Sequence, residues 1–174
     1  MRVVAKFGGT SLGSGSRIER AADTVAKAVE DGHEIAIVAS AMGSTTDELL
    51  DEITFEAEDA DRAEIVSMGE RTSVRMLKAA LRSRGVEATF LEPGSEAWPI
   101  ITDEYGEVDA EETVRRARAL AAELDHVVPV ITGFLAQTID GKVTTLGRGG
   151  SDTTAVMLGK FMDADEVVIV TDVE

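Results

Sequence analysis

A lysine followed by paired glycines and two hydroxyl residues is the clearest candidate in this sequence for binding a phosphate group. Residues 6–11 are Lys-Phe-Gly-Gly-Thr-Ser and follow an apolar run. Paired glycines let backbone N–H groups approach phosphate oxygens, and a following helix adds the positive end of its dipole. Lys6 could balance charge on a transferred phosphoryl group. Because the lysine precedes the glycines, this is not a Walker loop. An ordinary strand-to-helix turn with a solvated lysine explains it equally well.

A second Gly-rich loop precedes the helix expected at residues 153–162. Its polar and glycine members are Arg148, Gly149, Gly150, Ser151 and Asp152. The planar guanidinium of Arg148 suits a carboxylate, and the glycines permit a close backbone approach. Ser151 or Asp152 could act only as a helix cap. Capping explains neither the arginine nor the paired glycines, so we favour a binding loop.

Two further segments carry weaker signals. The hydroxyl residues of segment 40–46 could bind a small polar substrate, although a solvated turn with Thr46 or Asp47 as helix cap is the simpler interpretation. Glu70 could hold an ammonium group, but a solvated acid on a helix is the simpler prediction. The chain has two histidines and no cysteine, so we predict no transition-metal site.

Apolar runs and helical spacing alternate along the chain. Strands are expected at residues 2–7, 34–39, 86–91, 127–134 and 166–171. Helices are expected at residues 17–31, 61–84 (with a break near residue 69), 109–124 and 153–162, and another begins at residue 47. Asp140-Gly141 predicts a hairpin between residues 136–139 and 142–146. This pattern predicts an α/β fold with a mainly parallel sheet sandwiched between helices. Ligands bind at the carboxyl ends of such strands, so the site is expected in the loops after Phe7, Ala39 and Leu146.

The charge excludes some partners. Asp and Glu total 33 against 17 Lys and Arg, which gives a net charge of −16. This field repels nucleic acid and anionic membranes, so neither is an expected partner. No apolar run approaches the ~20 residues that span a bilayer. Without cysteine or a signal-peptide pattern, the chain is predicted to be cytoplasmic. The acids are spread along the chain, which favours a halophilic protein over a localised acidic interaction surface.

The polar loops, taken in this order and spacing, resemble those of the aspartokinases in the amino acid kinase superfamily. The matching stretches are residues 6–11, 40–49, 68–70, 133–134, 144–155 and 171–173. The resemblance spans nearly the whole chain and implies an amino acid kinase-like αβα fold. It also implies that ATP phosphorylates the side-chain carboxylate of L-aspartate to give 4-phospho-L-aspartate, the first step towards lysine, threonine and methionine.

The resemblance also assigns roles to single residues. Those implied in catalysis are Lys6 and Asp152. Those implied in binding ATP are Lys6, Phe7, Gly8, Gly9, Thr10, Ser11, Thr171 and Asp172. Those implied in binding aspartate are Ser40, Thr46, Glu70 (at the ammonium), Arg148 (at the α-carboxylate), Gly149, Gly150 and Ser151. A carboxylate nucleophile is already ionised at pH 7 and needs no general base, and Mg²⁺ would bridge the phosphates of ATP.

The resemblance further implies that residues 1–174 are an incomplete catalytic domain. In the family, the strand that begins at residues 171–173 continues into a nucleotide-binding segment and then into regulatory ACT domains, and the full-length protein is expected to be a homo-oligomer. Two alternatives stay open. The chain could be a non-catalytic ligand-binding or assembly fragment, or part of a kinase for another small carboxylate. Segments 40–46 and 148–152 argue against the latter.

If the acidic surface is an adaptation to salt, multimolar KCl should raise the midpoint of thermal unfolding, because salt screens the repulsion between like charges. Circular dichroism melts at low and at multimolar KCl measure this. A parallel series in sucrose controls for general stabilisation by excluded cosolutes. Equal midpoints at both salt concentrations would contradict the halophile hypothesis.

Overall fold

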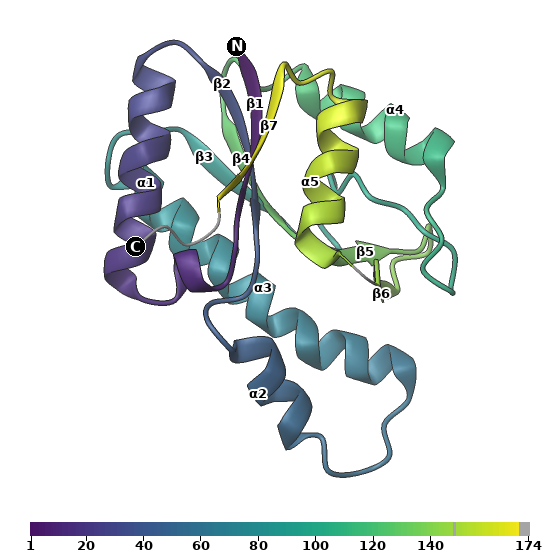
Figure 1. Ribbon diagram of the computed structural model, residues 1–174. Coiled ribbons are helices and arrows are strands. Elements are labelled where there is room, and N and C mark those ends of the chain that lie inside the picture. The colour runs from purple at the N-terminus through teal and green to yellow at the C-terminus, as the bar shows by residue number, and fades with distance from the viewer. Residues whose placement is uncertain (148, 171–174) are drawn as a thin grey trace.

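A five-stranded parallel sheet forms the centre of the molecule. The computed structural model describes residues 1–147 and 149–170. The strand order is β3-β4-β2-β1-β7, and every neighbouring pair is parallel (Figure 1). The strands are β1 (Arg2–Phe7), β2 (Glu34–Ala39), β3 (Ala88–Leu91), β4 (Val128–Thr132) and β7 (Glu166–Val170). The predicted α/β architecture is therefore confirmed.

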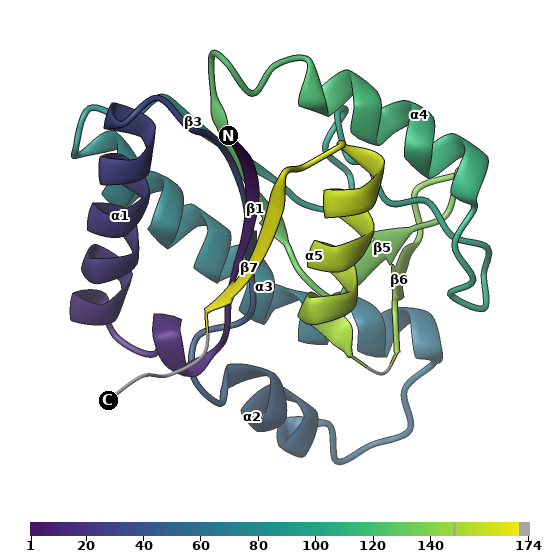
Figure 2. The same cartoon turned by 45° about the horizontal axis from the view of Figure 1, so that its top comes forward.

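Helices cover both faces of this sheet. The covering helices are α1 (Gly15–Glu30), α3 (Asp59–Arg82), α4 (Ala110–Ala121) and α5 (Gly150–Phe161), whereas α2 (Thr45–Glu52) packs on α3 and a short 3-10 helix η1 (Thr10–Leu12) follows β1. Helices α1 and α3 lie on one face, and α4 and α5 lie on the other (Figures 1 and 2). Within the described ranges, none of these helices combines the length and apolar character that a membrane span requires.

The central strands β2 and β4 are apolar on both faces, as expected for strands that helices cover on both sides. In β2, Ile35 and Ile37 pack with the α1 and α3 side chains, whereas Ala36 and Val38 pack with those of α4 and α5. The loop between β3 and α4 packs against the α4 and α5 side chains through Trp98. This residue is fully buried and donates its indole N–H to the carbonyl of Ile100 at 2.8 Å.

The helices differ from the sequence expectation at three places that affect the site. Helix α3 continues through Gly69, so the predicted break there is wrong. The glycine serves close packing instead, because a Cβ at this position would lie 2.7 Å from Cβ of Ala41. Helix α2 starts at Thr45 rather than Asp47, and α5 starts at Gly150, inside the segment predicted as a loop.

The predicted hairpin is present but lies outside the parallel sheet. Strands β5 (Leu135–Gln137) and β6 (Val143–Thr145) pair antiparallel as a separate two-stranded sheet. The loop after Leu146 therefore does not follow a strand of the main sheet, and that expectation is wrong. Phe134, at φ 70°, makes the sharp turn from β4 into the hairpin, and its N–H donates to Oγ1 of Thr154 in α5 at 3.0 Å.

Asp109 is the N-cap residue of α4. Its carboxylate accepts a hydrogen bond from the backbone N–H of Glu112 at 3.1 Å. The Asp109 N–H donates to the carbonyl of Ile101 at 2.8 Å rather than to Glu112, whose carboxylate pairs with Arg115 and Arg116. These two guanidinium groups hold the pKa of Glu112 at about 2.

Replacing Asp109 with alanine should lower the free energy of unfolding by about 1 kcal/mol, the usual value of a helix N-cap. Asp109→Asn retains an oxygen acceptor and should keep most of that stability. Urea denaturation measures both variants. Equal losses for the alanine and asparagine variants would show that the cap contributes nothing.

Candidate functional site

The carboxyl ends of β1, β2 and β4 meet at one edge of the sheet. The hydrogen-bond ladder continues past the strands, since Ser40 N–H donates to the carbonyl of Phe7 at 3.1 Å and Gly133 N–H donates to that of Ala39 at 2.9 Å. Beyond this point, Gly43 N–H donates to the carbonyl of Gly9 at 2.8 Å. The loops after β1 and β2 are therefore hydrogen-bonded side by side.

Two glycines permit these loops to touch. A Cβ on Gly9 would lie 2.8 Å from the carbonyl oxygen of Gly43, and a Cβ on Gly133 would overlap the side chain of Ser151. Real Cβ atoms do not approach other atoms so closely, so neither position accepts a side chain without movement of its neighbour. The glycines thus bring the first two loops and the start of α5 into contact.

Helix α5 is joined to the strand ends by an ion pair and a hydroxyl contact. The Lys6 Nζ atom lies 2.9 Å from Oδ1 of Asp152, with side-chain exposures of 13% and 56%. Ser40 Oγ donates to Ser151 Oγ at 2.8 Å. Asp152 is in the first turn of α5, where the helix dipole favours a negative charge. The structure therefore brings together both residues predicted to be catalytic.

The remaining residues of the first loop differ in what they can offer a ligand. Thr10 and Ser11 begin η1, and Thr10 is exposed. Gly8 lies beside the lysine, since a Cβ there would be 3.2 Å from Nζ of Lys6. Phe7 is 4% exposed and its ring is part of the core under α1 and α3. The ring cannot reach a nucleotide, so any contribution of Phe7 to ATP binding is limited to its backbone.

Glu70 is buried, which corrects the expectation of a solvated acid. It is 4% exposed, and its Oε2 atom has no hydrogen-bond partner. Burial raises the pKa of Glu70 to about 7, opposed by a backbone hydrogen bond. The preceding residue, Gly69, packs against Ala41 and Thr46, so this turn of α3 lies under the loop after β2. A buried carboxyl group of this kind is suited to a cationic partner.

Thr46 faces a different hollow from Lys6. A cavity of about 640 Å³ lies between the α2–α3 helices and the β5–β6 hairpin, and its lining includes Thr46 and Phe134 but not Lys6, Ser40 or Ser151. Gly150 borders it indirectly, because a Cβ there would lie 3.3 Å from the Phe134 ring. Gly149 precedes α5 in the left-handed region at φ 84°. The predicted ligands Arg148, Thr171 and Asp172 lie outside the described residues.

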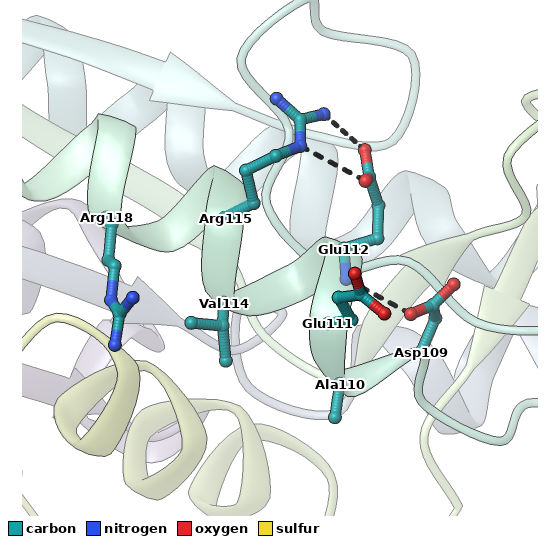
Figure 3. Close-up of a pocket in the computed structure, with 7 residues that line it drawn as sticks. All are labelled: Asp109, Ala110, Glu111, Glu112, Val114, Arg115 and Arg118. Carbon is teal, nitrogen blue, oxygen red and sulfur yellow. Dashed lines mark hydrogen bonds and ion pairs between the residues drawn. The ribbon is translucent and has the colours of Figure 1, made fainter.

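A larger hollow of about 920 Å³ lies along α4 and is no part of this site (Figure 3). Two of its carboxylates are already engaged, because Glu112 pairs with Arg115 and Asp109 accepts from the N–H of Glu112. Its lining comes from the beginning and middle of one helix rather than from strand ends. An open surface of this kind does not indicate a ligand-binding site.

Sequence reasoning missed two hydroxyl groups near Glu70. Ser73 and Thr132 are fully buried, and their oxygen atoms have no hydrogen-bond partner. The spacing of Ser73, three residues after Glu70 on one helix, places both on the same face and is a signal available in the sequence. No local pattern marks Thr132, because its neighbourhood depends on the packing of α3 over β4.

These features define a three-layer α/β protein whose polar site lies at the carboxyl ends of parallel strands. The chain belongs to the amino acid kinase family, whose profile matches residues 1–174. It is 40% identical over 177 residues to an aspartokinase of Thermus thermophilus, and 37% identical over 176 residues to one of Geobacillus stearothermophilus. Its fold matches that of E. coli aspartokinase III in complex with aspartate and ADP, with a TM-score of 0.82 and 26% identity.

The matched regions cover nearly all of this chain but only part of the relatives. The alignments span 99% and 98% of the chain, but 43% and 42% of the Thermus and Geobacillus proteins. For the E. coli structure the shares are 99% and 49%. The chain therefore spans less than half the length of the curated relatives that it matches.

The buried Glu70 carboxyl group should make stability depend on pH. Its folded-state pKa of about 7 exceeds the ordinary value of 4.5, so between these values the folded protein keeps a proton that the unfolded chain has lost. The contribution of Glu70 to stability therefore falls as pH rises through this window, by about 3 kcal/mol in total. Above the window it is constant.

The variant Glu70→Gln should remove this dependence. Relative to the wild type it should gain stability steadily from about pH 5 to about pH 8 in urea denaturation. Glu64→Gln, which removes an exposed acid from the same helix, is the matched control. Parallel stability curves for wild type and Glu70→Gln would contradict the assignment.

Proposed function

We propose that this chain is part of an aspartate kinase, which transfers the γ-phosphoryl group of ATP to the side-chain carboxylate of L-aspartate and forms 4-phospho-L-aspartate. The observation that carries the proposal is the assembly of Lys6, Ser40, Ser151 and Asp152 at one edge of the sheet. Its kinship with aspartokinases, one of them solved with aspartate and ADP, supports the same reaction.

The proposed reaction needs alignment and charge neutralisation rather than proton transfer. A carboxylate oxygen of aspartate attacks the γ-phosphorus, the bond to the β-phosphate oxygen breaks, and ADP leaves with that electron pair. Lys6 is positioned to balance the charge on the transferred group. The glycines at positions 8 and 9 leave space for phosphate oxygens beside the backbone.

Recognition of aspartate would use groups of opposite charge. Glu70 supplies a buried carboxyl group for the ammonium, and ammonium binding would favour its ionised form. Ser40, Ser151 and the backbone at Gly149 and Gly150 would contact aspartate at the strand ends, and Thr46 would contact it from the neighbouring cavity. Arg148 would take the α-carboxylate, since its guanidinium can bind both carboxylate oxygens.

Magnesium would reach this site with the phosphates of ATP, as is usual for this ion. The described residues contain no cluster of three or more acidic or histidine side chains that would hold the ion by itself. Asp152, beside Lys6, is the carboxylate placed to be a further ligand. Bound to ATP, the ion would neutralise charge on the phosphates.

The proposal extends to the cellular setting. The reaction would open the synthesis of lysine, threonine and methionine in the cytoplasm, and the protein would act as a homo-oligomer. The excess of 33 acids over 17 basic residues supports adaptation to a salt-rich cytoplasm. Neither nucleic acid nor membrane is a proposed partner, because the same charge repels both.

The complete gene product should give aspartate-dependent acyl phosphate that hydroxylamine traps as the hydroxamate. Lys6→Met should lower kcat by about a hundredfold or more, because it removes charge stabilisation in the transition state. Lys160→Met, which changes an exposed lysine at the other end of α5, is the matched control and should be active. No aspartate-dependent signal from the wild type would refute the proposed function.

The alternative of a non-catalytic fragment is favoured by one observation, namely that the chain spans less than half of its relatives. Calorimetry of the 174-residue chain with aspartate and with MgATP separates the two. We expect weak ATP binding and little turnover from this chain alone. Micromolar ATP binding with turnover would reject the inert alternative.

A further inference from the structure

Three buried side-chain oxygen atoms have no hydrogen-bond partner, two of them on α3 and one at the end of β4. Among the described residues, the unpartnered buried side-chain oxygens are Oε2 of Glu70, Oγ of Ser73 and Oγ1 of Thr132. Ser73 and Thr132 are fully buried, and Glu70 is 4% exposed. Buried polar atoms are nearly always paired, so three exceptions together require a common explanation.

The fold places these atoms on facing surfaces. Glu70 and Ser73 are one helical turn apart on the buried side of α3, which packs on β2 and β4. Val130 of β4 shares a core cluster with Val74 of α3. Thr132 is two residues beyond Val130, so strand alternation turns its side chain to the same side of the sheet. The hydroxyl groups of Ser73 and Thr132 therefore lie on the side of the sheet that α3 covers, as does the carboxyl group of Glu70.

The two oxygens of Glu70 are in different situations. Oε2 is buried and has no hydrogen-bond partner. Among the described residues, Oε1 is not one of the buried atoms that lack a partner. Neighbouring Ser67 shows the contrast, since its hydroxyl donates to the Glu64 carbonyl at 2.6 Å and accepts from Nε of Arg71 at 2.9 Å. Ser73 and Thr132 have no such competing partner and can serve the inner carboxylate oxygen.

We propose that Ser73 and Thr132 are positioning residues for Glu70: through one ordered water, their hydroxyl groups hydrogen-bond to its inner oxygen, Oε2, and hold Oε1 toward the site. Hydroxyl donors favour the charged form of a carboxyl group. They would let Glu70 be ionised inside the core when a cation binds. The assignment of the cation as the ammonium group of aspartate rests on the proposed function.

The pKa of Glu70 should depend on the hydroxyl groups of Ser73 and Thr132, and it can be measured without any substrate. Its shift arises from burial and is opposed by a backbone hydrogen bond, and among the described residues no charged side chain from α3 or the elements packed on it contributes. Removing a hydroxyl donor should therefore raise the pKa of Glu70 further. We expect Ser73→Ala and Thr132→Val each to raise the pKa of Glu70 by about one pH unit in ¹³C-carboxyl NMR titrations, with the resonance assigned by Glu70→Gln.

Two controls separate positioning from general damage to the core. Ser67→Ala removes an equally buried hydroxyl one turn earlier on α3 and should leave the pKa of Glu70 unchanged. Thr132→Ser keeps the hydroxyl while removing a methyl group and should retain the wild-type value. If Ser73→Ala and Thr132→Val fold but leave this pKa where it is, the proposal is overturned. It is equally overturned if Ser67→Ala shifts the pKa as much as they do.

Aspartate binding provides a second readout. At about pH 7, Thr132→Val should bind aspartate about fivefold more weakly, because less Glu70 is ionised, and the loss should disappear near pH 9. The NMR titration tests the positioning role, and aspartate binding tests the proposed substrate, so one can be refuted without the other. A pKa shift without aspartate binding would support the positioning role and refute the substrate. Aspartate binding that Thr132→Val does not weaken at pH 7 would refute the positioning role and keep the substrate.

Discussion

The site depends on the hydrogen-bond register that ends β1, β2 and β4 at one level. The ladder continues one residue past each pair, through the N–H groups of Ser40 and Gly133. Three chain segments must then turn away within a small space, which side chains would fill. Gly9 and Gly133 are located where backbone or side-chain atoms leave no room for a Cβ. The close packing of the backbone segments therefore determines where the polar side chains of the site lie.

Much of this arrangement could be predicted from the order of residues. Continuous apolar runs separated by helical spacing identify parallel strands, because only strands covered on both faces lack polar positions. The loop after Phe7 could be placed at the strand ends for the same reason. The family resemblance assigns Lys6 and Asp152 to catalysis, and in the structure their side chains form an ion pair at 2.9 Å.

Other features depend on packing that no local pattern contains. Glu70 has the sequence environment of a surface acid, but the close packing of Gly69 against Ala41 places this turn of α3 under the loop after β2. The loop near Gly149 follows a hairpin strand rather than a strand of the main sheet, and the turn at Phe134 returns the chain toward α5. Such placements arise from contacts between residues distant in sequence, which propensity and periodicity do not record.

The ion pair of Lys6 and Asp152 has a consequence for how a phosphate group would be accepted. An ammonium group that is only 13% exposed needs a counter-ion at all times, because isolated charge is costly away from water. Asp152 fills that need in the absence of ligand. Arrival of a phosphate is then an exchange of one anionic partner for another rather than the creation of a new pair. Such an exchange moderates the affinity, yet keeps the lysine extended and aligned between one turnover and the next.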